Sequence, residues 1–354
     1  MSDNSPYIGL NKRSYWKTAV AGGMSDALSG IYRPRFTIST TDAVVTAGSC
    51  FAQHIGTNLK KRGYVVLDAE PAPPGLSPDV AKAYGFGLYS ARYGNVYTAR
   101  QLRQLLVEAL SDQPTRAIAW LKNGRAYDAL RPSVEPNGLP SAEDVARHRS
   151  AHLAAVRSLL EQVDVFVFTL GLTEVWLDRA TGAAYPTAPG TVAGSYNPDE
   201  VRFHNLSYNE VVDDLNAAVD IIRNLRPSAR FIFTVSPVPL TATATDDHVL
   251  VATTRSKAIL RAAVDDVISK RADCDYFPSF EIITGAMSGN VFFEKNLRSV
   301  TAQGVKAVMN TFFSSHGDVQ HADRTQEFSN PEDQSDIKDS VVCEDALLDA
   351  FAKS

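Results

Sequence analysis

The stretch AVVTAGSCFAQHIG, from Ala43 to Gly56, indicates a β-strand that turns directly into an α-helix. Its first four residues favour extended structure, and the small residues Ala47–Cys50 form a corner that Gly48 allows the backbone to make. Apolar residues then recur every three to four positions, which is the spacing of one helix face. The stretch therefore predicts the first strand–helix unit of an α/β fold.

Strands and helices of ordinary length alternate along the rest of the chain. Apolar, β-branched runs predict strands at Ala43–Thr46, Asp164–Gly171, Arg230–Pro237 and Cys274–Thr284, with a weaker one at Gly63–Ala69. Helical patterns are found at Thr98–Leu110, Glu143–Val163, Tyr208–Leu225, His248–Ala272 and Thr301–Phe313. This alternation predicts a mainly parallel sheet of about five strands, covered by helices on both faces.

Composition limits the classes of function. The 354 residues include 35 basic and 40 acidic side chains without a basic block, which argues against nucleic-acid or membrane partners. Three scattered cysteines argue against a disulfide framework or a cysteine-rich metal site and favour a reducing compartment. Without a secretory leader or a long apolar window, we expect a cytoplasmic protein.

The chain divides by composition into three segments. We expect an N-terminal extension over residues 1–39, one α/β domain over residues 40–313, and a tail over residues 314–354. The tail is polar and acidic, which is typical of poorly ordered chain, but its last residues favour a short helix.

Cys50 is the first candidate for chemistry. The start of a helix offers unpaired amides and the positive end of the helix dipole, and both favour a reactive thiolate. The same amides can hold the oxyanion of a reaction intermediate. Equally, Cys50 can be a small apolar residue that fills a tight junction, as we expect for Cys274 at the start of a core strand. The residue types alone leave both interpretations open.

Several motifs resemble those of the GSCFA family, and they occur in the same order. They are GSCFA (Gly48–Ala52), GNVYTARQL (Gly94–Leu102), TLGLTEVW (Thr169–Trp176), SPVPLTAT (Ser236–Thr243), SKAILRAAV (Ser256–Val264) and YFPSFEI (Tyr276–Ile282). GSCFA domains are in turn similar to the SGNH (GDSL-like) superfamily of ester hydrolases and acyltransferases. The resemblance implies a flavodoxin-like, three-layer α/β/α fold for most of residues 40–313.

The resemblance also implies roles for particular residues. The Gly-Asp-Ser corner of SGNH enzymes falls on Gly48–Cys50, which places Cys50 at the nucleophile and leaves Ser49 as its rival. The Gly-x-Asn-Asp block falls on Gly171–Glu174, so that Thr173 stands at the oxyanion-hole asparagine. The remaining backbone donor is Gly87 or Gly94. Gly48, Gly94 and Gly171 would thus line the substrate site.

The general base is the weak point of this alignment, because the Asp-x-x-His pair of SGNH enzymes is missing. The corresponding stretch, FFEKNLRSVTAQGV, offers only Asn296 and Ser299. His248 follows the third main strand beside Asp246 and Asp247, so it is either the base or a residue of the helix start. His54 lies one helical turn after Cys50 and is the second candidate.

Other charged residues have two interpretations each. Glu174 is either an acid/base group or the ion-pair partner of Arg92, Arg255 or Arg298, and Lys257 is an ion-pair partner or a substrate anchor. His204 either lines a pocket or has a structural role. We expect His148 and His152, on a charged helix, to face solvent.

Together these features favour an ester or thioester hydrolase or an O-acyltransferase with a thioester intermediate on Cys50. Its substrate would be a small molecule or a glycan hydroxyl, with acyl-CoA as a co-substrate, no other cofactor and no metal. The long segments Pro71–Asn95 and Asp178–Glu200 would shape the pocket. The alternatives are a ligand-binding module that has lost the chemistry, and a redox sensor built on Cys50.

Overall fold

The computed structural model describes residues 5–111, 118–317 and 344–353. Its contacts divide these residues into two units, one formed by 5–37 with 277–317 and the other by 38–111, 118–276 and 344–353. The predicted domain at residues 40–313 therefore runs across both units. Most of the predicted polar tail, with Cys343, lies outside the described residues.

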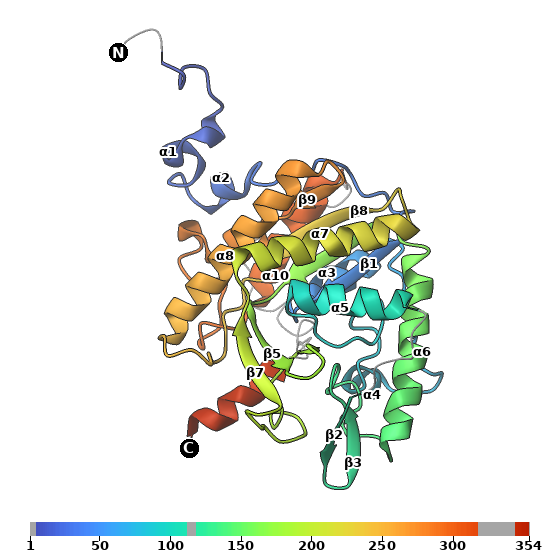
Figure 1. The fold of residues 1–354 in the computed structure, drawn as a ribbon. Helices are drawn as coiled ribbons and strands as arrows, with labels where there is room; N and C mark the ends of the chain where they lie inside the picture. The colour runs from blue at the N-terminus through green and yellow to red at the C-terminus, as the bar shows by residue number, and fades with distance from the viewer. Residues whose placement is uncertain (1–4, 112–117, 318–343, 354) are drawn as a thin grey trace. The chain divides into compact units, whose positions relative to one another are not determined.

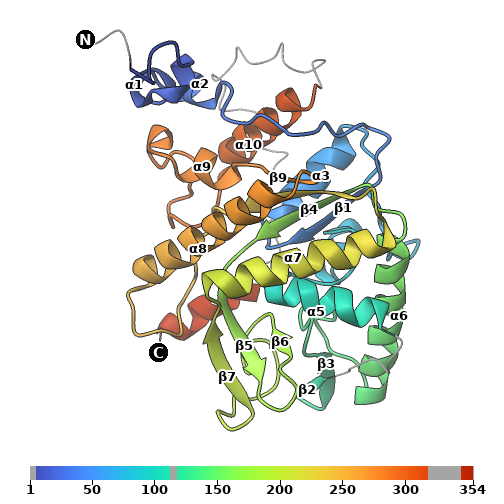
Figure 2. The same ribbon diagram turned by 45° about the horizontal axis from the view of Figure 1, so that its top comes forward.

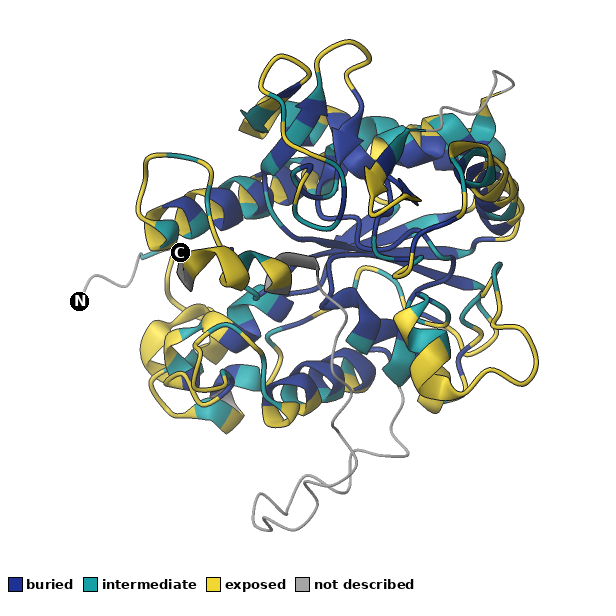
Figure 3. Cartoon of the chain, turned by 90° about the horizontal axis from the view of Figure 1, so that it is seen from below, coloured by how far each residue is buried: buried dark blue, intermediate teal, exposed yellow. Residues whose placement is uncertain are grey.

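The larger unit is built on a four-stranded parallel sheet (Figure 1). The strands follow the order β1 (Val44–Gly48), β4 (Val165–Leu170), β8 (Arg230–Val235) and β9 (Cys274–Tyr276). Every residue of β1 and β4 is buried. In Figure 3 the strands of the main sheet are mostly dark blue, the colour of buried residues. The α/β class and the parallel sheet are thus confirmed, as is the reading of near-continuous apolar runs as strands buried on both faces.

Two predicted strands are wrong in whole or in part. Gly63–Ala69 forms only one parallel bridge, Val66 to Val44, at the outer edge of β1. The run Cys274–Thr284 leaves the sheet after Tyr276, and α9 (Ser279–Thr284) follows. Pro278 has no N–H to continue a ladder, and it stands directly before this helix.

The predicted helices are confirmed to within a few residues. They are α5 (Ala99–Leu110), α6 (Ala142–Leu160), α7 (Tyr208–Leu225), α8 (Val249–Lys270) and α10 (Ala302–Ser315). Thr98 and Ser207 begin α5 and α7 with capping boxes, in which the third helical residue, Gln101 or Glu210, reaches back to the cap. In Figure 2, α5, α7 and α8 lie side by side in front of the sheet, and α3 (Ala52–Lys61) lies behind it.

The remaining elements are short. In the larger unit they are α4 (Pro78–Ala83), β2 (Ala119–Lys122), β3 (Arg125–Asp128), β5 (Glu174–Asp178), β6 (Ala184–Tyr185), β7 (Val201–Asn205) and the 3₁₀ helix η5 (Glu344–Lys353). In the smaller unit they are η1 (Lys12–Ser14), α1 (Trp16–Ala19), α2 (Met24–Leu28), α9 and η2 (Ala286–Ser288), which accompany α10.

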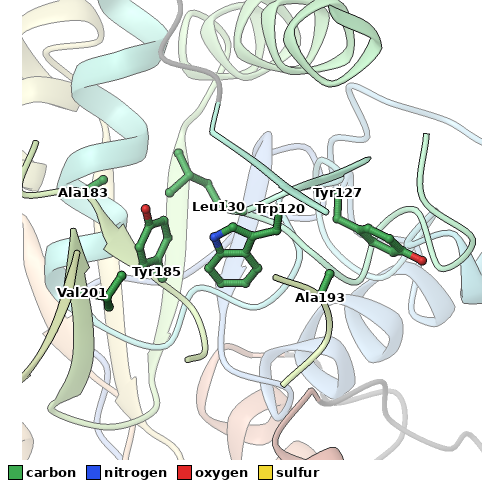
Figure 4. Packing of buried hydrophobic residues seen from close by; sticks show 8 residues of the cluster. Trp120, Tyr127, Leu130, Ala183, Tyr185, Ala193 and Val201 are labelled. Carbon is green, nitrogen blue, oxygen red and sulfur yellow. The ribbon is translucent and has the colours of Figure 1, made fainter. Parts of the chain in front are cut away.

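Two small antiparallel sheets were not predicted. One is the hairpin β2–β3, and the other has the order β6-β5-β7. No strand was predicted in the segment GLTEVW, but β5 begins at Glu174, with only three residues between it and the end of β4. A shared apolar cluster joins the two sheets, and within it the Trp120 and Tyr185 rings lie 5.0 Å apart (Figure 4). Because β5 follows β4 so closely, these two small sheets lie at the carboxyl edge of the main sheet.

Candidate active site

The corner after β1 depends on Gly48. Its φ is 137°, and a Cβ at this position would lie 2.4 Å from the carbonyl oxygen of Thr169 on β4. Real Cβ atoms do not approach backbone so closely, so β1 and β4 can run this near to each other only with glycine here. The amide of Ser49 then donates to the same carbonyl at 2.9 Å, which fixes the backbone immediately before Cys50.

Cys50 lies in the turn between β1 and α3, where the residue is 6% exposed. The first turn of α3 is tight: the amides of residues 52–54 donate to the carbonyls of residues 49–51, at 2.8–3.2 Å. Fewer amides are therefore open than we expected for a helix start. The amide of Phe51 donates to no acceptor among the described residues, so one backbone donor stays open directly after Cys50.

Ser49 is buried beside the segment that leaves β4. It is 3% exposed, and within the part of the chain that the structure describes its hydroxyl has no hydrogen-bond partner. A Cβ on Gly171 would lie 3.1 Å from the Cβ of Ser49, so the two residues are in direct contact. The structure thus places Ser49 against Gly171, and Cys50 is the next residue in the chain.

The segment after β4 is held by hydrogen bonds on every side. Gly171 donates to the carbonyl of Tyr97 at 2.8 Å and accepts from the Lys257 ammonium at 2.6 Å. The Thr173 amide donates to the Ser256 hydroxyl at 2.9 Å, and the Thr173 hydroxyl donates to Asn205 at 2.7 Å. Thr173 is fully buried, and its hydroxyl already donates its hydrogen bond to Asn205, so in this structure it is not available to an oxyanion.

Glu174 does not form the ion pair that we considered. Its carboxylate accepts hydrogen bonds from the Thr243 hydroxyl at 2.6 Å and from the Ala244 amide at 3.2 Å, and the side chain is half-buried. Arg92 pairs instead with Glu135, at 2.7 Å. Glu174 therefore ties β5 to the loop that follows β8.

The candidate bases have different surroundings. His248 is exposed, and its Nδ1 accepts from the Leu250 amide at 3.2 Å, so it is itself the N-cap of α8. His204, on β7, lies 2.7 Å from Glu210, which supports the structural interpretation. His54 is half-buried on α3, with its ring 5.6 Å from the Phe51 ring. Of the three, His54 shares an element with the Cys50 corner.

Of the two candidate glycine donors, the structure distinguishes Gly94 from Gly87. Gly87 is exposed, whereas Gly94 is buried and lies two residues before Val96, whose amide donates to the Gly48 carbonyl at 2.9 Å. Asn95 lies between Gly94 and Val96, and its side chain accepts a hydrogen bond from the Tyr89 hydroxyl at 2.5 Å. The Tyr89 hydroxyl in turn accepts one from the side-chain amide of Gln53 at 3.1 Å. Sequence reasoning missed this buried polar chain behind the corner.

His152 contradicts our expectation of a solvated residue, because it is fully buried. Its Nδ1 lies 2.7 Å from the Glu70 carboxylate, and its Nε2 has no hydrogen-bond partner in residues 5–111, 118–317 and 344–353. Burial, and next the charge of Arg131, lower the pKa of His152 to about 4, so the imidazole is neutral at pH 7 with its proton on Nδ1. A sequence signal was present: His152 lies three residues after the buried Arg149 and four before the buried Val156, on one helix face.

The partners of His152 form a buried polar network between α6 and the hairpin. Burial acts to raise the pKa of Glu70, but hydrogen bonds from His152 and Arg92, with the charge of Arg131, lower it to about 2. Arg131 pairs with Asp128 at 2.7 Å, and Arg149 pairs with Glu108 at 2.5 Å. His148, by contrast, is about half exposed, as expected.

A small cavity adjoins the Gly94–Val96 segment. It measures about 20 Å³ and is lined by Asn95, Gln101, Gln104 and Arg149, among others. That volume holds a water molecule and no acyl group.

Comparison with known proteins identifies the family of the chain. Within the described residues no helix combines the length and the apolar character needed to cross a bilayer. No curated protein matches the sequence. The sequence model of the GSCFA family matches residues 43–312, and the chain therefore belongs to the GSCFA family.

Proposed function

We propose that this protein is an acyl-transfer enzyme whose nucleophile is the thiol of Cys50. The observation that carries the proposal is the corner itself. Cys50 follows a glycine-dependent turn at the carboxyl end of β1, a buried strand of the parallel sheet, beside the open amide of Phe51. In open α/β sheets, ligands bind at this end of the strands.

The proposed reaction has two halves. The Cys50 sulfur, after its proton passes to His54, attacks the acyl carbonyl carbon, and the carbonyl electron pair moves to oxygen. When C=O re-forms, the bond to the leaving group breaks, and the leaving group takes the proton from His54. Water or an acceptor hydroxyl then attacks the thioester and gives its proton to His54, while Cys50 departs as thiolate.

His54 is the imidazole that best fits this proton transfer. It lies four residues after Cys50 at the start of α3, where side chains one turn apart are neighbours. His248 is the N-cap of α8 and His204 lies on β7, so neither shares an element with the Cys50 corner. Among donors, a thioester such as acyl-CoA suits the site, because a thiolate leaves more readily than an alkoxide.

We further propose that the fold is of the flavodoxin-like SGNH type. If the Val66 bridge is counted as a strand, the sheet has the order Val66-β1-β4-β8-β9, which is the 2-1-3-4-5 order of flavodoxin-like sheets. The Gly94 and Gly171 segments then flank the corner, as in an oxyanion site. An acceptor hydroxyl on a small metabolite or a glycan agrees with this type of enzyme.

Hydrolysis of p-nitrophenyl acetate and of a panel of acyl-CoA thioesters, with and without sugar acceptors, tests the proposal. We expect Cys50→Ala to lower turnover by about 10³-fold or more, because the covalent route is lost. Cys274→Ala is the matched control, since Cys274 is a fully buried strand residue, and it should keep its rate. Full activity in Cys50→Ala contradicts the proposal.

A ligand-binding module is the second candidate. It is favoured by the Thr173 hydroxyl, which is engaged by Asn205, and by the exposure of His248. Such a module would be stabilised by an acyl ligand in thermal unfolding without consuming it, and its stabilisation would survive Cys50→Ala.

A further inference from the structure

The Ser49 hydroxyl is a buried polar group that has no hydrogen-bond partner among the described residues, and Ser49 directly precedes the proposed nucleophile. Buried hydroxyls are nearly always hydrogen-bonded, so an orphan of this kind calls for an explanation. We propose that Ser49 is the side-chain donor that binds the oxyanion formed when Cys50 attacks the substrate. The inference rests on the proposed function and replaces Thr173 in the role that the alignment implies.

Ser49 is better suited to donate a hydrogen bond than to attack. A serine nucleophile needs a base within hydrogen-bond reach to take its proton. The Ser49 Oγ has no acceptor among the described residues, so nothing in the described structure activates it. As a neutral hydroxyl it still carries a proton that it can offer to an incoming oxygen.

The surroundings of Ser49 are rigid, which an oxyanion donor requires. Its own amide is bonded to Thr169, and its side chain rests against Gly171. Gly171 is in turn bonded to the Tyr97 carbonyl and to the buried ammonium of Lys257. Lys257 is therefore a positioning residue, because it holds the backbone that supports Ser49.

Three other buried hydroxyls lack a hydrogen-bond partner among the described residues, those of Thr46, Thr169 and Thr241. Thr46 and Thr169 lie inside paired strands, and Thr241 lies in the loop between β8 and α8. Thr46 is covered by α3, since a Cβ on Gly56 would lie 3.0 Å from its hydroxyl oxygen. Ser49 comes after the last paired residue of β1 and directly before Cys50. Of these hydroxyls, that of Ser49 is therefore the one next to the proposed nucleophile in the chain.

In the proposed step the sulfur of Cys50 forms the C–S bond, and the carbonyl electron pair becomes the oxyanion. The oxyanion accepts hydrogen bonds from the Ser49 hydroxyl and the Phe51 amide. Ser49 keeps its proton throughout, and both hydrogen bonds weaken when C=O re-forms and the leaving group departs. Ser49 thus touches the reacting oxygen without forming a covalent bond.

The test compares Ser49→Ala with the wild type in two assays, thioester turnover and alkylation of Cys50 by iodoacetamide followed by peptide mapping. Alkylation creates no oxyanion. We expect Ser49→Ala to lower kcat by about 10²- to 10³-fold and to leave the alkylation rate within about twofold. Thr169→Val, which removes another orphan hydroxyl, should keep both rates within about threefold, because that hydroxyl lies inside a strand.

Each other outcome is informative. A Ser49→Ala protein with near wild-type kcat overturns the inference and leaves Cys50 chemistry intact. If Ser49→Ala is inactive while Cys50→Ala turns over substrate, Ser49 is the nucleophile and the inference is wrong. If the wild-type protein neither turns over nor becomes acylated, the proposed function fails, and the inference fails with it.

Discussion

At Gly48 the backbone of β1 touches the backbone of β4, and this contact sets the position of both Ser49 and Cys50. Gly48→Ala should destabilise the protein by about 3 kcal/mol or more, because a methyl group would meet the Thr169 carbonyl and φ is positive. Denaturant unfolding measures this loss. The measurement needs no knowledge of the substrate.

Gly87→Ala is the matched control. Gly87 also has a positive φ, but it is exposed and no atom lies within 4 Å of the added Cβ. We expect it to cost about 1 kcal/mol, the ordinary price of a left-handed alanine. Equal losses in the two variants would show that the β1–β4 contact is not constrained as described.

The residue types at the corner could be predicted from the sequence, and their hydrogen bonds could not. The small-residue corner with Cys50 follows from the run Ala43–Gly56 alone. Whether the Thr173 hydroxyl can donate to a substrate depends on Asn205, which lies 32 residues further along the chain. Such partners are decided by tertiary packing, which no local pattern records.

At the scale of elements, a variant at the start of α8 tests whether His248 acts as the N-cap of this helix or as the general base. As the exposed N-cap it accepts from the Leu250 amide. We expect His248→Ala to reduce the free energy of unfolding by about 1 kcal/mol and to leave acyl transfer unchanged at equal folded fraction. Denaturant unfolding together with the thioester assay checks both parts. A rate loss of tenfold or more, at preserved fold, would restore His248 as the base.

Long buried strands and capped helices were the elements most readily predicted. Continuous apolar runs identify β4 and β8, and α7 has the bounds that its pattern predicts. The wrong predictions concern short apolar runs, which are compatible with either a strand or a helix. Phe277–Thr284 resembles a strand but forms a helix after Pro278, and β5 follows β4 so closely that no separate strand was predicted there.

Across the larger unit as a whole, the buried pair of His152 and Glu70 makes stability depend on pH. Because the pKa of His152 is lowered from 6.5 to about 4, the unfolded chain takes up a proton in that range and the folded chain does not. Stability should therefore be full above pH 6.5 and fall by roughly 2–3 kcal/mol towards pH 4. Below pH 4.5 protonation of Glu70, whose pKa is lowered to about 2, extends the loss.

His152→Gln is the variant that tests this dependence, because an amide can still donate to Glu70 but does not titrate. Unfolding in denaturant at pH 7 and pH 4.5 should show a smaller acid loss in the variant than in the wild type. The same loss in both proteins would mean that His152 is not the group responsible. The polar network around His152 was not predicted because its residues come from four segments that are far apart in the sequence. In addition, the charged helix that holds His152 was expected to face solvent.

The central claim is that the Cys50 sulfur carries the acyl group during turnover. Intact-mass spectrometry of the protein after rapid quenching with acyl-CoA donors, followed by peptide mapping, tests it most directly. We predict one added acyl mass on the peptide that holds residue 50, in the wild type and in Cys274→Ala, and none in Cys50→Ala. An adduct at Ser49 would contradict the account, and so would turnover by the wild type and Cys274→Ala without any adduct on this peptide.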